Sequence, residues 1–518
     1  MTVQTWLRQA RRSLLATGAT AVLTVALLVG TEATSQAASQ APCDLYASGG
    51  TPCVAAHSTT RALYGAYNGA LYQVRRASDS ATKDIGLLSA GGYADAAAQD
   101  TFCAGTTCVI TVIYDQSGRG NKLTQAPAGG AAPGPDNLAP ATAAPVTVAG
   151  HRAYGVYVAA GTGYRNNKTN GTATGDQPEG MYAVLDGTHF GGGCCFDYGN
   201  AETNNLDTGN GHMEAIYFGD STIWGSGTGK GPWVMADLEN GLFSGPDAGY
   251  NANDPSVSHR FLTAIVKGAP NLWAIKAGNA QSGGLSTYYN GARPNVPGYN
   301  PMHKEGAIIL GIGGDNSKSS SGTFYEGVMT SGYPTDATEN AVQANITAAN
   351  YQAPVLTSTA LTPGARVSLK ATTAPCCDTH YLRHQADGTV TISPITSTST
   401  SSDKKDATWI VRAGLANSSC LSFESAAAPG QYLRHAAFQL HTAAPNATTL
   451  FDQDATFCLQ AGHSGQGYSF QSVNYPNRFL RHYAYTGYLA GDGVGGNTWD
   501  SDALWSEDTS WLTAQPWS

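Results

Sequence analysis

Tyr381-Leu-Arg-His384 is the first of three copies of one short phrase, and the other two are Tyr432-Leu-Arg-His435 and Phe479-Leu-Arg-His482. An Asp followed by two small residues and an aromatic residue comes about twenty residues after each copy, at Asp406, Asp454 and Asp508. A threefold repeat of about 50 residues, with short apolar runs broken by Gly, Pro and Asn, predicts three equivalent β-rich units around one core. The closed form of such a repeat is a β-trefoil.

The polar residues of the repeat indicate sugar binding. A His and an Asp that return in each unit supply a hydrogen-bond donor and a carboxylate, which together can hold neighbouring hydroxyl groups of a sugar. Alternatively, the His ends a strand and satisfies a backbone carbonyl. Core packing would repeat the apolar residues and not the polar pair, so binding is the favoured interpretation. The predicted pockets are His384 with Asp406, His435 with Asp454, and His482 with Asp508.

The amino end of the chain predicts export. Arg8, Arg11 and Arg12 precede an apolar run from Leu14 to Val29, and Ser35-Gln-Ala37 is a small-x-small cleavage pattern. Residues 1–37 are therefore expected to be a secretory signal peptide that is removed, by either the general or the twin-arginine route. No later segment approaches eighteen uninterrupted apolar residues, so no membrane span is expected in the mature chain.

The composition excludes one large class of partners. Residues 1–37 hold three of the 28 basic and one of the 37 acidic residues, which leaves 25 against 36 in the mature chain, a net charge of −11. Nucleic-acid binding needs a basic surface, so it is not expected. Glycine is abundant, at 62 of 518 residues, and charged residues make up only 13%. This composition suits a secreted all-β protein with many turns.

All ten cysteines follow the predicted signal peptide, and no CxxC pair suggests a zinc site. Three disulfides are expected from spacing, namely Cys43–Cys53, Cys103–Cys108 and Cys420–Cys458. The other four cysteines form two adjacent pairs, Cys194-Cys195 and Cys376-Cys377. Neighbouring Cα atoms lie about 3.8 Å apart, closer than the usual disulfide range of about 4.4–6.8 Å. For both pairs, a bond and two separate thiols remain alternatives at this point.

Two domains are predicted after the signal peptide, at 38–353 and 354–518. The first has short apolar segments between Gly-rich turns, which is typical of a β-sandwich, here of jelly-roll type. Examples are Val109–Tyr114, Ala183–Leu185, Phe261–Val266 and Ala307–Ile312. One helix is predicted over Ala337–Tyr351, followed by a Pro-containing linker into the repeats. The predicted fold class is therefore all-β throughout.

The segment Trp233-Val-Met-Ala-Asp-Leu-Glu-Asn-Gly241 carries the clearest chemical signal of the first domain. As a strand, it would turn Val234, Ala236 and Leu238 to the core and the alternate residues, Asp237 and Glu239 among them, to the other face. Two carboxylates in one row repel each other unless a ligand, donor or proton compensates. Asp315, after the apolar strand and glycines of Ile312-Gly-Gly-Asp315, is a second candidate acid on a rim.

These motifs resemble a known family. Gly191-Gly-Gly-Cys-Cys-Phe-Asp-Tyr198, Ala236-Asp-Leu-Glu-Asn-Gly-Leu-Phe243 and Gly313-Gly-Asp-Asn316 resemble glycoside hydrolase family 54, the secreted α-L-arabinofuranosidases. The three Leu-Arg-His units resemble their attached arabinofuranose-binding trefoil, carbohydrate-binding module family 42. The resemblance covers essentially the whole mature chain in the same domain order.

The resemblance implies a role for each matching residue. Glu239 matches the nucleophile and Asp315 the general acid/base of a retaining reaction that needs no metal or organic cofactor. Cys194–Cys195 matches a disulfide that lies against the sugar ring. Trp224, Asp237, Asn240 and Gly314 match groups that shape the arabinose subsite. In the trefoil, the second and third pockets match the better-supported sugar sites, and the first unit is expected to be the degenerate one.

The chemistry of the residues agrees with these roles. A retaining glycosidase needs one carboxylate to attack the anomeric carbon and one carboxylic acid to protonate the leaving oxygen. We expect hydrogen bonds, from Asn240 among others, to keep Glu239 ionised. The expected function is exo-acting removal of arabinofuranosyl side chains from arabinoxylan, arabinan or related polysaccharides by a monomer. The alternatives are a related furanosidase, such as a β-galactofuranosidase, and a non-catalytic lectin.

Overall fold

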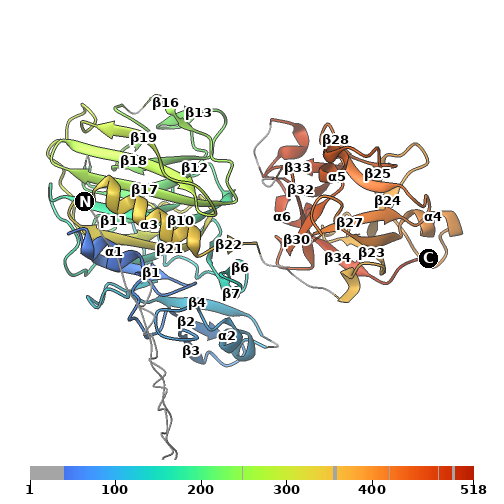
Figure 1. The fold of residues 1–518 in the computed structure, drawn as a ribbon, viewed down its shortest axis with the longest axis horizontal. Coiled ribbons are helices and arrows are strands. Elements are labelled where there is room, and N and C mark those ends of the chain that lie inside the picture. Colours follow the sequence, from blue (N-terminus) through green and yellow to red (C-terminus); the bar gives the residue numbers. More distant parts are fainter. Residues whose placement is uncertain are drawn as a thin grey trace, which may run out of the picture. The chain divides into compact units, whose positions relative to one another are not determined.

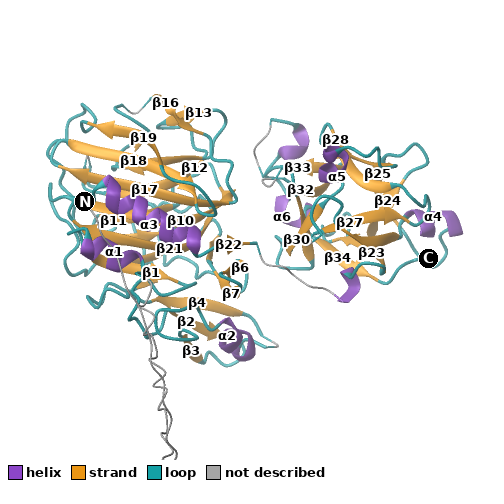
Figure 2. Ribbon diagram, viewed as in Figure 1, coloured by secondary structure: helices purple, strands orange, loops and turns teal. Residues whose placement is uncertain are grey.

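The computed structural model describes residues 40–104, 106–209, 211–247, 249–353, 359–418, 420–475, 478–492 and 496–518. The predicted signal peptide, residues 1–37, and part of the predicted linker, residues 354–358, lie outside these ranges. Within them, no helix is long and apolar enough to cross a membrane. Strands predominate over helices in both domains, as Figure 2 shows, so the all-β prediction is confirmed.

Two large sheets form the first domain, which Figure 1 shows in blue through yellow. The seven-stranded sheet contains, in spatial order, β1 (Cys53–Ser58), β21 (Gly322–Ser331), β10 (Glu179–Phe190), β17 (Phe261–Ala269), β18 (Leu272–Asn279) and β19 (Ser286–Gly291), with β8 (Val156–Val158) beside β21. The ten-stranded sheet contains β15 (Leu242–Phe243), β14 (Trp233–Asp237), β12 (Glu214–Gly219), β11 (Asp197–Ala201), β20 (Ala307–Leu310), β9 (Tyr164–Asn166), β5 (Leu123–Gln125), β4 (Cys108–Ile113), β2 (Tyr72–Arg76) and β3 (Thr82–Ile85). One smaller sheet pairs β13 (Ser226–Thr228) with β16 (Tyr250–Pro255). Another has β6 (Pro145–Val148) between β22 (Tyr351–Gln352) and β7 (His151–Tyr154).

The domain core lies where the two large sheets face each other. Val184 and Ile265 of one sheet and Ile216 of the other belong to a single buried cluster. Along β14 the side chains alternate as predicted: Val234 and Ala236 enter this main cluster, whereas Trp233 and Met235 pack on the other face in a separate small cluster. The period of two therefore gave the correct faces, and the sandwich-like architecture is confirmed.

Helices cover only small parts of the first domain. They are α1 (Pro42–Ser48), α2 (Ala96–Phe102) and α3 (Asp336–Ala348). The predicted helix over Ala337–Tyr351 corresponds to α3, which the Thr335 hydroxyl caps and which ends three residues earlier than expected, so that Tyr351 starts β22. Lys267 of β17 and Lys276 of β18 both pair with Glu339 of α3, at 2.9 and 2.6 Å, and so hold the helix on the sheet.

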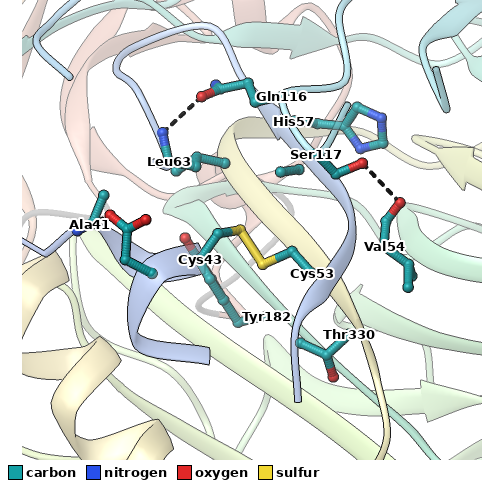
Figure 3. The surroundings of a disulfide bond; sticks show 12 residues. Ala41, Cys43, Cys53, Val54, His57, Leu63, Gln116, Ser117, Tyr182 and Thr330 are labelled. Carbon is teal, nitrogen blue, oxygen red and sulfur yellow. Dashed lines mark hydrogen bonds between the residues drawn. A yellow bond between two sulfur atoms is a disulfide. The ribbon is translucent and has the colours of Figure 1, made fainter. Parts of the chain in front are cut away.

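Five disulfides occur among the described residues. Cys43–Cys53 joins α1 to β1, and Figure 3 shows it beside Tyr182, with the Ser117 hydroxyl donating to the Val54 carbonyl at 3.0 Å nearby. The other four are Cys103–Cys108, Cys194–Cys195, Cys376–Cys377 and Cys420–Cys458. Both adjacent pairs are therefore bonded, including Cys376–Cys377, for which the sequence left two alternatives.

The described part of the C-terminal domain contains twelve strands in three repeats of four. They are β23 (Arg366–Ala371), β24 (His380–His384), β25 (Val390–Pro394), β26 (Trp409–Ala413), β27 (Leu421–Ser425), β28 (Tyr432–Ala436), β29 (Gln439–Ala443), β30 (Phe457–Ala461), β31 (Tyr468–Ser472), β32 (Phe479–Tyr483), β33 (Thr486–Ala490) and β34 (Trp511–Ala514). One buried cluster contains apolar residues of all three repeats, Leu382, Leu433 and Leu480 among them. The single shared core agrees with the sequence, and the closed trefoil form stays a prediction.

The Leu-Arg-His sequence forms the same local structure in each of the three repeats. In each repeat the strand that carries Leu-Arg-His and the strand after it precede a short helix that ends on the predicted Asp. These helices are α4 (Ser401–Asp406), α5 (Thr449–Asp454) and α6 (Trp505–Asp508). The Arg of each phrase pairs with that Asp: Arg383 with Asp406 at 3.1 Å, Arg434 with Asp454 at 2.6 Å and Arg481 with Asp508 at 3.0 Å. The repeated Arg therefore has a structural role that neither interpretation of the repeat, sugar binding or a strand end, had assigned to it.

Candidate active site

A pocket of about 170 Å³ in the first domain brings together most of the predicted site residues. Its lining contains the predicted residues Cys194, Trp224, Asp237, Glu239, Asn240, Gly314 and Asp315. It also contains six residues that were not predicted as site residues, namely Glu202, Asp207, Met213, Gly241, Leu242 and Ser317. Of the predicted subsite only Cys195 does not line the pocket, because its side chain is fully buried behind Cys194.

The chain reverses directly after β14, and this turn aims Glu239. The strand ends at Asp237, so the prediction that Glu239 continues along it was wrong. Glu239 and Asn240 instead adopt left-handed backbone conformations, with φ of 65° and 53°. Such conformations cost non-glycine residues about 1 kcal/mol or more each and tend to persist at functional sites. The Tyr299 hydroxyl donates to the Glu239 carbonyl oxygen and helps to fix the turn.

Three main-chain N–H groups hold the Glu239 carboxylate. Oε1 accepts from the N–H groups of Thr208 at 2.6 Å and Gly209 at 2.7 Å, and Oε2 accepts from that of His212 at 3.1 Å. The hydrogen bonds of the described residues do not include the expected one from Asn240, whose side-chain amide faces the Asp207 carboxylate instead. Several N–H donors on one carboxylate favour its ionised form, which is the form that a nucleophile needs.

Asp315 lies half-buried on a loop that follows β20, as the apolar strand and its glycines predicted. Its Oδ1 accepts the Ser317 N–H at 2.9 Å. The buried Arg165 side chain of β9 supports the loop on either side, donating to the Gly314 carbonyl at 2.6 Å and to the Asn316 side-chain oxygen at 3.0 Å. The loop therefore has a fixed base while Asp315 faces the pocket.

The Cys194–Cys195 disulfide is attached to the same loop. The Cys195 N–H donates to the Ser317 carbonyl at 3.3 Å, and the Ser319 N–H donates to the Cys194 carbonyl at 2.9 Å. One sulfur of the pair, that of Cys195, lies 3.5 Å from the Asp237 carboxylate. The disulfide thus connects the Asp315 loop to the end of β14, and Trp224, with 36% of its surface exposed, lies at the pocket opening.

Buried carboxyl groups other than Glu239 gather around the pocket. Burial raises the pKa of Asp237 to about 7, opposed by the hydrogen bond from the Glu239 N–H. Burial and the neighbouring Asp237 raise the pKa of Asp197 well above its usual range. Burial is the main cause that raises the pKa of Glu202 to about 10, and the interaction with the Glu239 carboxyl group is the second cause. At neutral pH the site therefore contains protonated as well as ionised carboxyl groups.

The three predicted sugar pockets of the C-terminal domain are not equivalent. His435 lies 3.2 Å from Asp454, and His482 lies 3.5 Å from Asp508. Among the described residues, His384 has no such pair with Asp406 and contacts the Thr442 hydroxyl at 2.6 Å instead. Asp403 also competes for Arg383 in this first unit, at 2.5 Å. The geometry of the first unit therefore differs from that of the other two, and which units bind sugar stays a prediction.

Family comparisons agree with both domains. Residues 42–352 match the family described as alpha-L-arabinofuranosidase B, catalytic, and residues 370–513 match the alpha-L-arabinofuranosidase B domain that accompanies it. The chain belongs to the α-L-arabinofuranosidase B family. It is therefore a glycoside hydrolase of family 54 with a C-terminal carbohydrate-binding domain, as the resemblance of its motifs implied.

Individual members of this family are similar over nearly the whole chain. The probable alpha-L-arabinofuranosidase B of Aspergillus clavatus is 63% identical over 491 residues, covering 94% of this chain and 96% of the relative. The alpha-L-arabinofuranosidase of Hypocrea jecorina is 63% identical over 478 residues, or 91% and 95% of the two chains. A solved arabinofuranosidase complexed with arabinofuranosyl-alpha-1,2-xylobiose is 57% identical, with a TM-score of 0.65 over 92% of this chain and 100% of that chain.

Proposed function

We propose that this arabinofuranosidase is a retaining, exo-acting enzyme that removes single α-L-arabinofuranosyl side chains from arabinoxylan and related polysaccharides. In this proposal Glu239 is the nucleophile and Asp315 the general acid/base. The observation that carries it is that these two carboxyl groups line one small pocket while only Glu239 is held by three main-chain N–H donors. A nucleophile must be ionised and a general acid must be protonated, so the two carboxyl groups need different surroundings, as these two have.

The reaction takes two steps at one anomeric carbon. The Glu239 carboxylate attacks that carbon while the Asp315 carboxylic acid protonates the leaving oxygen, so the glycosidic bond breaks as the glycosyl–enzyme ester forms. Asp315, now ionised, then takes a proton from water, whose oxygen displaces Glu239 from the sugar. Two inversions leave the anomeric configuration unchanged.

The pocket size supports exo action. A volume of about 170 Å³ is suited to one compact ring and not to a polysaccharide chain. The Cys194 side of the disulfide and Trp224 supply apolar surface for the ring faces, while Asp237, Asn240 and the Gly314 main chain supply polar groups for its hydroxyls. A solved relative has been complexed with an arabinose linked to xylobiose, which supports arabinoxylan as the substrate class.

The C-terminal domain is proposed to bind arabinose side chains through its second and third units. Burial lowers the pKa of His435, and burial lowers that of His482 to about 4. Both imidazoles are therefore neutral at neutral pH and can donate to or accept from sugar hydroxyls beside a carboxylate. Two weak pockets on one module gain by avidity on a polymer with many side chains.

Export of the enzyme is part of the proposal. The five disulfides fit an extracellular protein. Together with the sequence of residues 1–37, they support secretion and action on plant polysaccharide outside the cell.

Hydrolysis of three nitrophenyl glycosides tests the proposed function. We expect rapid release of nitrophenol from the α-L-arabinofuranoside and much slower release from the β-galactofuranoside and β-xylopyranoside. Proton NMR of the first product should show the α-anomer before mutarotation. Preference for the galactofuranoside would indicate the related furanosidase, turnover of none would indicate a lectin, and initial β-anomer would exclude retention.

A further inference from the structure

Glu202 is a third carboxyl group at the nucleophile, and neither the motifs nor the proposed mechanism uses it. It follows β11 by one residue, its side chain is fully buried, and it lines the active-site pocket together with Glu239. Among the described residues, no N–H or O–H group of another residue donates to either of its carboxyl oxygens. Glu202 and Glu239 line the same small pocket, and their carboxyl groups lie close enough to interact directly.

The surrounding chain holds this carboxyl group in place. The guanidinium group of Arg165 donates to the main-chain carbonyl of Glu202 and, at 2.6 Å, to that of Gly314. A side chain at position 314 would overlap the Glu202 carboxyl oxygens, so Gly314 allows the loop of Asp315 to pass directly over them. The guanidinium group of Arg165 thus donates to these carbonyl oxygens and not to the Glu202 carboxyl group, although its charge acts on that group.

Two carboxyl groups can hydrogen-bond to each other only when one of them is protonated. Glu239 accepts main-chain N–H groups of three other residues and Glu202 accepts none from other residues, so the shared proton belongs on Glu202. The other charged groups that act on the pair are acidic except for Arg165, and their charge disfavours a second negative charge on the pair. These groups are Asp197, Asp237, Asp315 and Arg165.

We propose that Glu202 is a positioning residue that remains a neutral carboxylic acid and donates a hydrogen bond to the Glu239 carboxylate. The proposal deepens the proposed function and rests on Glu239 being the nucleophile. A neutral donor stabilises the charge of Glu239 before attack and again when the glycosyl–enzyme ester is cleaved, and it adds no negative charge beside the developing cationic sugar.

Two substitutions at Glu202 separate this role from that of an ionised carboxylate. Glu202→Gln keeps a neutral donor of nearly the same shape, whereas Glu202→Leu keeps the bulk and removes the donor. We expect Glu202→Gln to retain kcat/KM within a few-fold and Glu202→Leu to lose about 10- to 100-fold, the range for one hydrogen bond to a charged group. A substantially larger loss in Glu202→Gln, approaching that of Glu239→Gln, would overturn the proposal.

The direction of the pH shift is the second readout. Without its donor, ionised Glu239 is less stable, so the acid limb of kcat/KM in Glu202→Leu should move to higher pH. If Glu202 were ionised, its removal would relieve repulsion and move the limb to lower pH, and that result, or an unchanged limb, would contradict the proposal. Asp254→Asn is the matched control, because it removes a buried carboxyl group without a donor that lies outside the pocket lining.

Infrared spectroscopy tests the protonation state without any turnover. The difference spectrum of the unsubstituted enzyme minus Glu202→Gln at neutral pH should contain the carbonyl band of a protonated carboxylic acid. A carboxylate band in its place would overturn the proposal, even if Glu202→Leu failed to fold. Absence of arabinofuranosidase activity in the unsubstituted protein would instead reject the proposed function and leave this measurement valid.

Discussion

The main-chain N–H of Glu239 donates a 2.9 Å hydrogen bond to Oδ1 of Asp237, two residues earlier in the chain. A carboxylate that accepts from the main chain two residues on is a standard way to reverse a chain tightly. Asp237 therefore determines where β14 ends and Glu239 leaves the sheet. The proposed nucleophile reaches the pocket because of this turn and not because of the alternation of a strand.

The first prediction concerns the charge of Glu239. Glu239→Gln should reduce turnover of a nitrophenyl arabinofuranoside by several orders of magnitude, because it keeps the shape and removes the attacking charge. Azide should rescue Glu239→Gly by attacking the anomeric carbon from the vacated side, and the single inversion should give β-arabinosyl azide. Near-normal activity of Glu239→Gln would reject the assignment.

The second prediction concerns Asp315. Asp315→Asn should slow the hydrolysis of natural arabinosides far more than that of aryl arabinosides with good leaving groups, because proton donation matters most when the departing oxygen is basic. The measurement is a comparison of kcat/KM across leaving groups of different pKa. An equal loss for all leaving groups would assign Asp315 a structural role.

The third prediction concerns the C-terminal pockets. Replacing both His435 and His482 by Ala should weaken binding to insoluble arabinoxylan and lower the ratio of polymer to aryl-arabinoside hydrolysis. The His residues are better targets than Asp454 and Asp508, because each Asp also pairs with an Arg, and a buried Arg such as Arg481 would be left without its partner.

His384→Ala is the matched control for this prediction. His384 lacks the His–Asp pair of the other two units, so its loss should change polymer binding much less. Polymer binding that survives the double substitution would place the sugar sites elsewhere, and a large effect of His384→Ala would show that the first unit also binds.

The fourth prediction concerns the pH dependence of stability. Both carboxyl oxygens of Asp254 are buried without a donor among the described residues, and burial raises its pKa to about 8. In an unfolded chain the value is about 3.9. Between these values the unfolded chain has released a proton that the folded protein keeps, so this group makes stability fall as pH rises from about 4 to about 8.

Asp254→Asn should remove this loss. The variant should gain up to a few kcal/mol relative to the unsubstituted enzyme at pH 8, and little at pH 4 where Asp254 is protonated in the folded protein. Denaturant unfolding at both pH values measures the difference. An equal gain at both values would indicate a packing effect and not ionisation.

Strand alternation and sequence repeats were enough to predict which strand faces are buried and how many repeat units share one core. The period of two in residues 233–237 gave the correct faces of β14, and the three Leu-Arg-His phrases gave three equivalent units with one core. The repeat did not reveal the role of its Arg. In the structure Arg383, Arg434 and Arg481 each pair with the Asp of their own unit. A charged residue inside a strand reveals its partner only when the fold is known.

The site was predictable where its residues belong to motifs and not where they come from isolated positions. Glu202 is one acidic residue after a strand, with no glycine or aromatic signature, and it reaches Glu239 only because the Asp315 loop and Arg165 close over it. The donors to Glu239 were also missed, because they are peptide groups of residues 208, 209 and 212, and a peptide group leaves no mark in a sequence.

Those peptide donors also bear on how the enzyme can be altered. An N–H group is present in every amino acid except proline, so substitutions of Thr208 or His212 would leave the electrostatic support of Glu239 largely in place. Random mutagenesis of this segment should thus rarely shift the working pH. An engineer who wants an arabinofuranosidase for more acidic or more alkaline pulp would do better to vary side chains on the opposite side of the pocket.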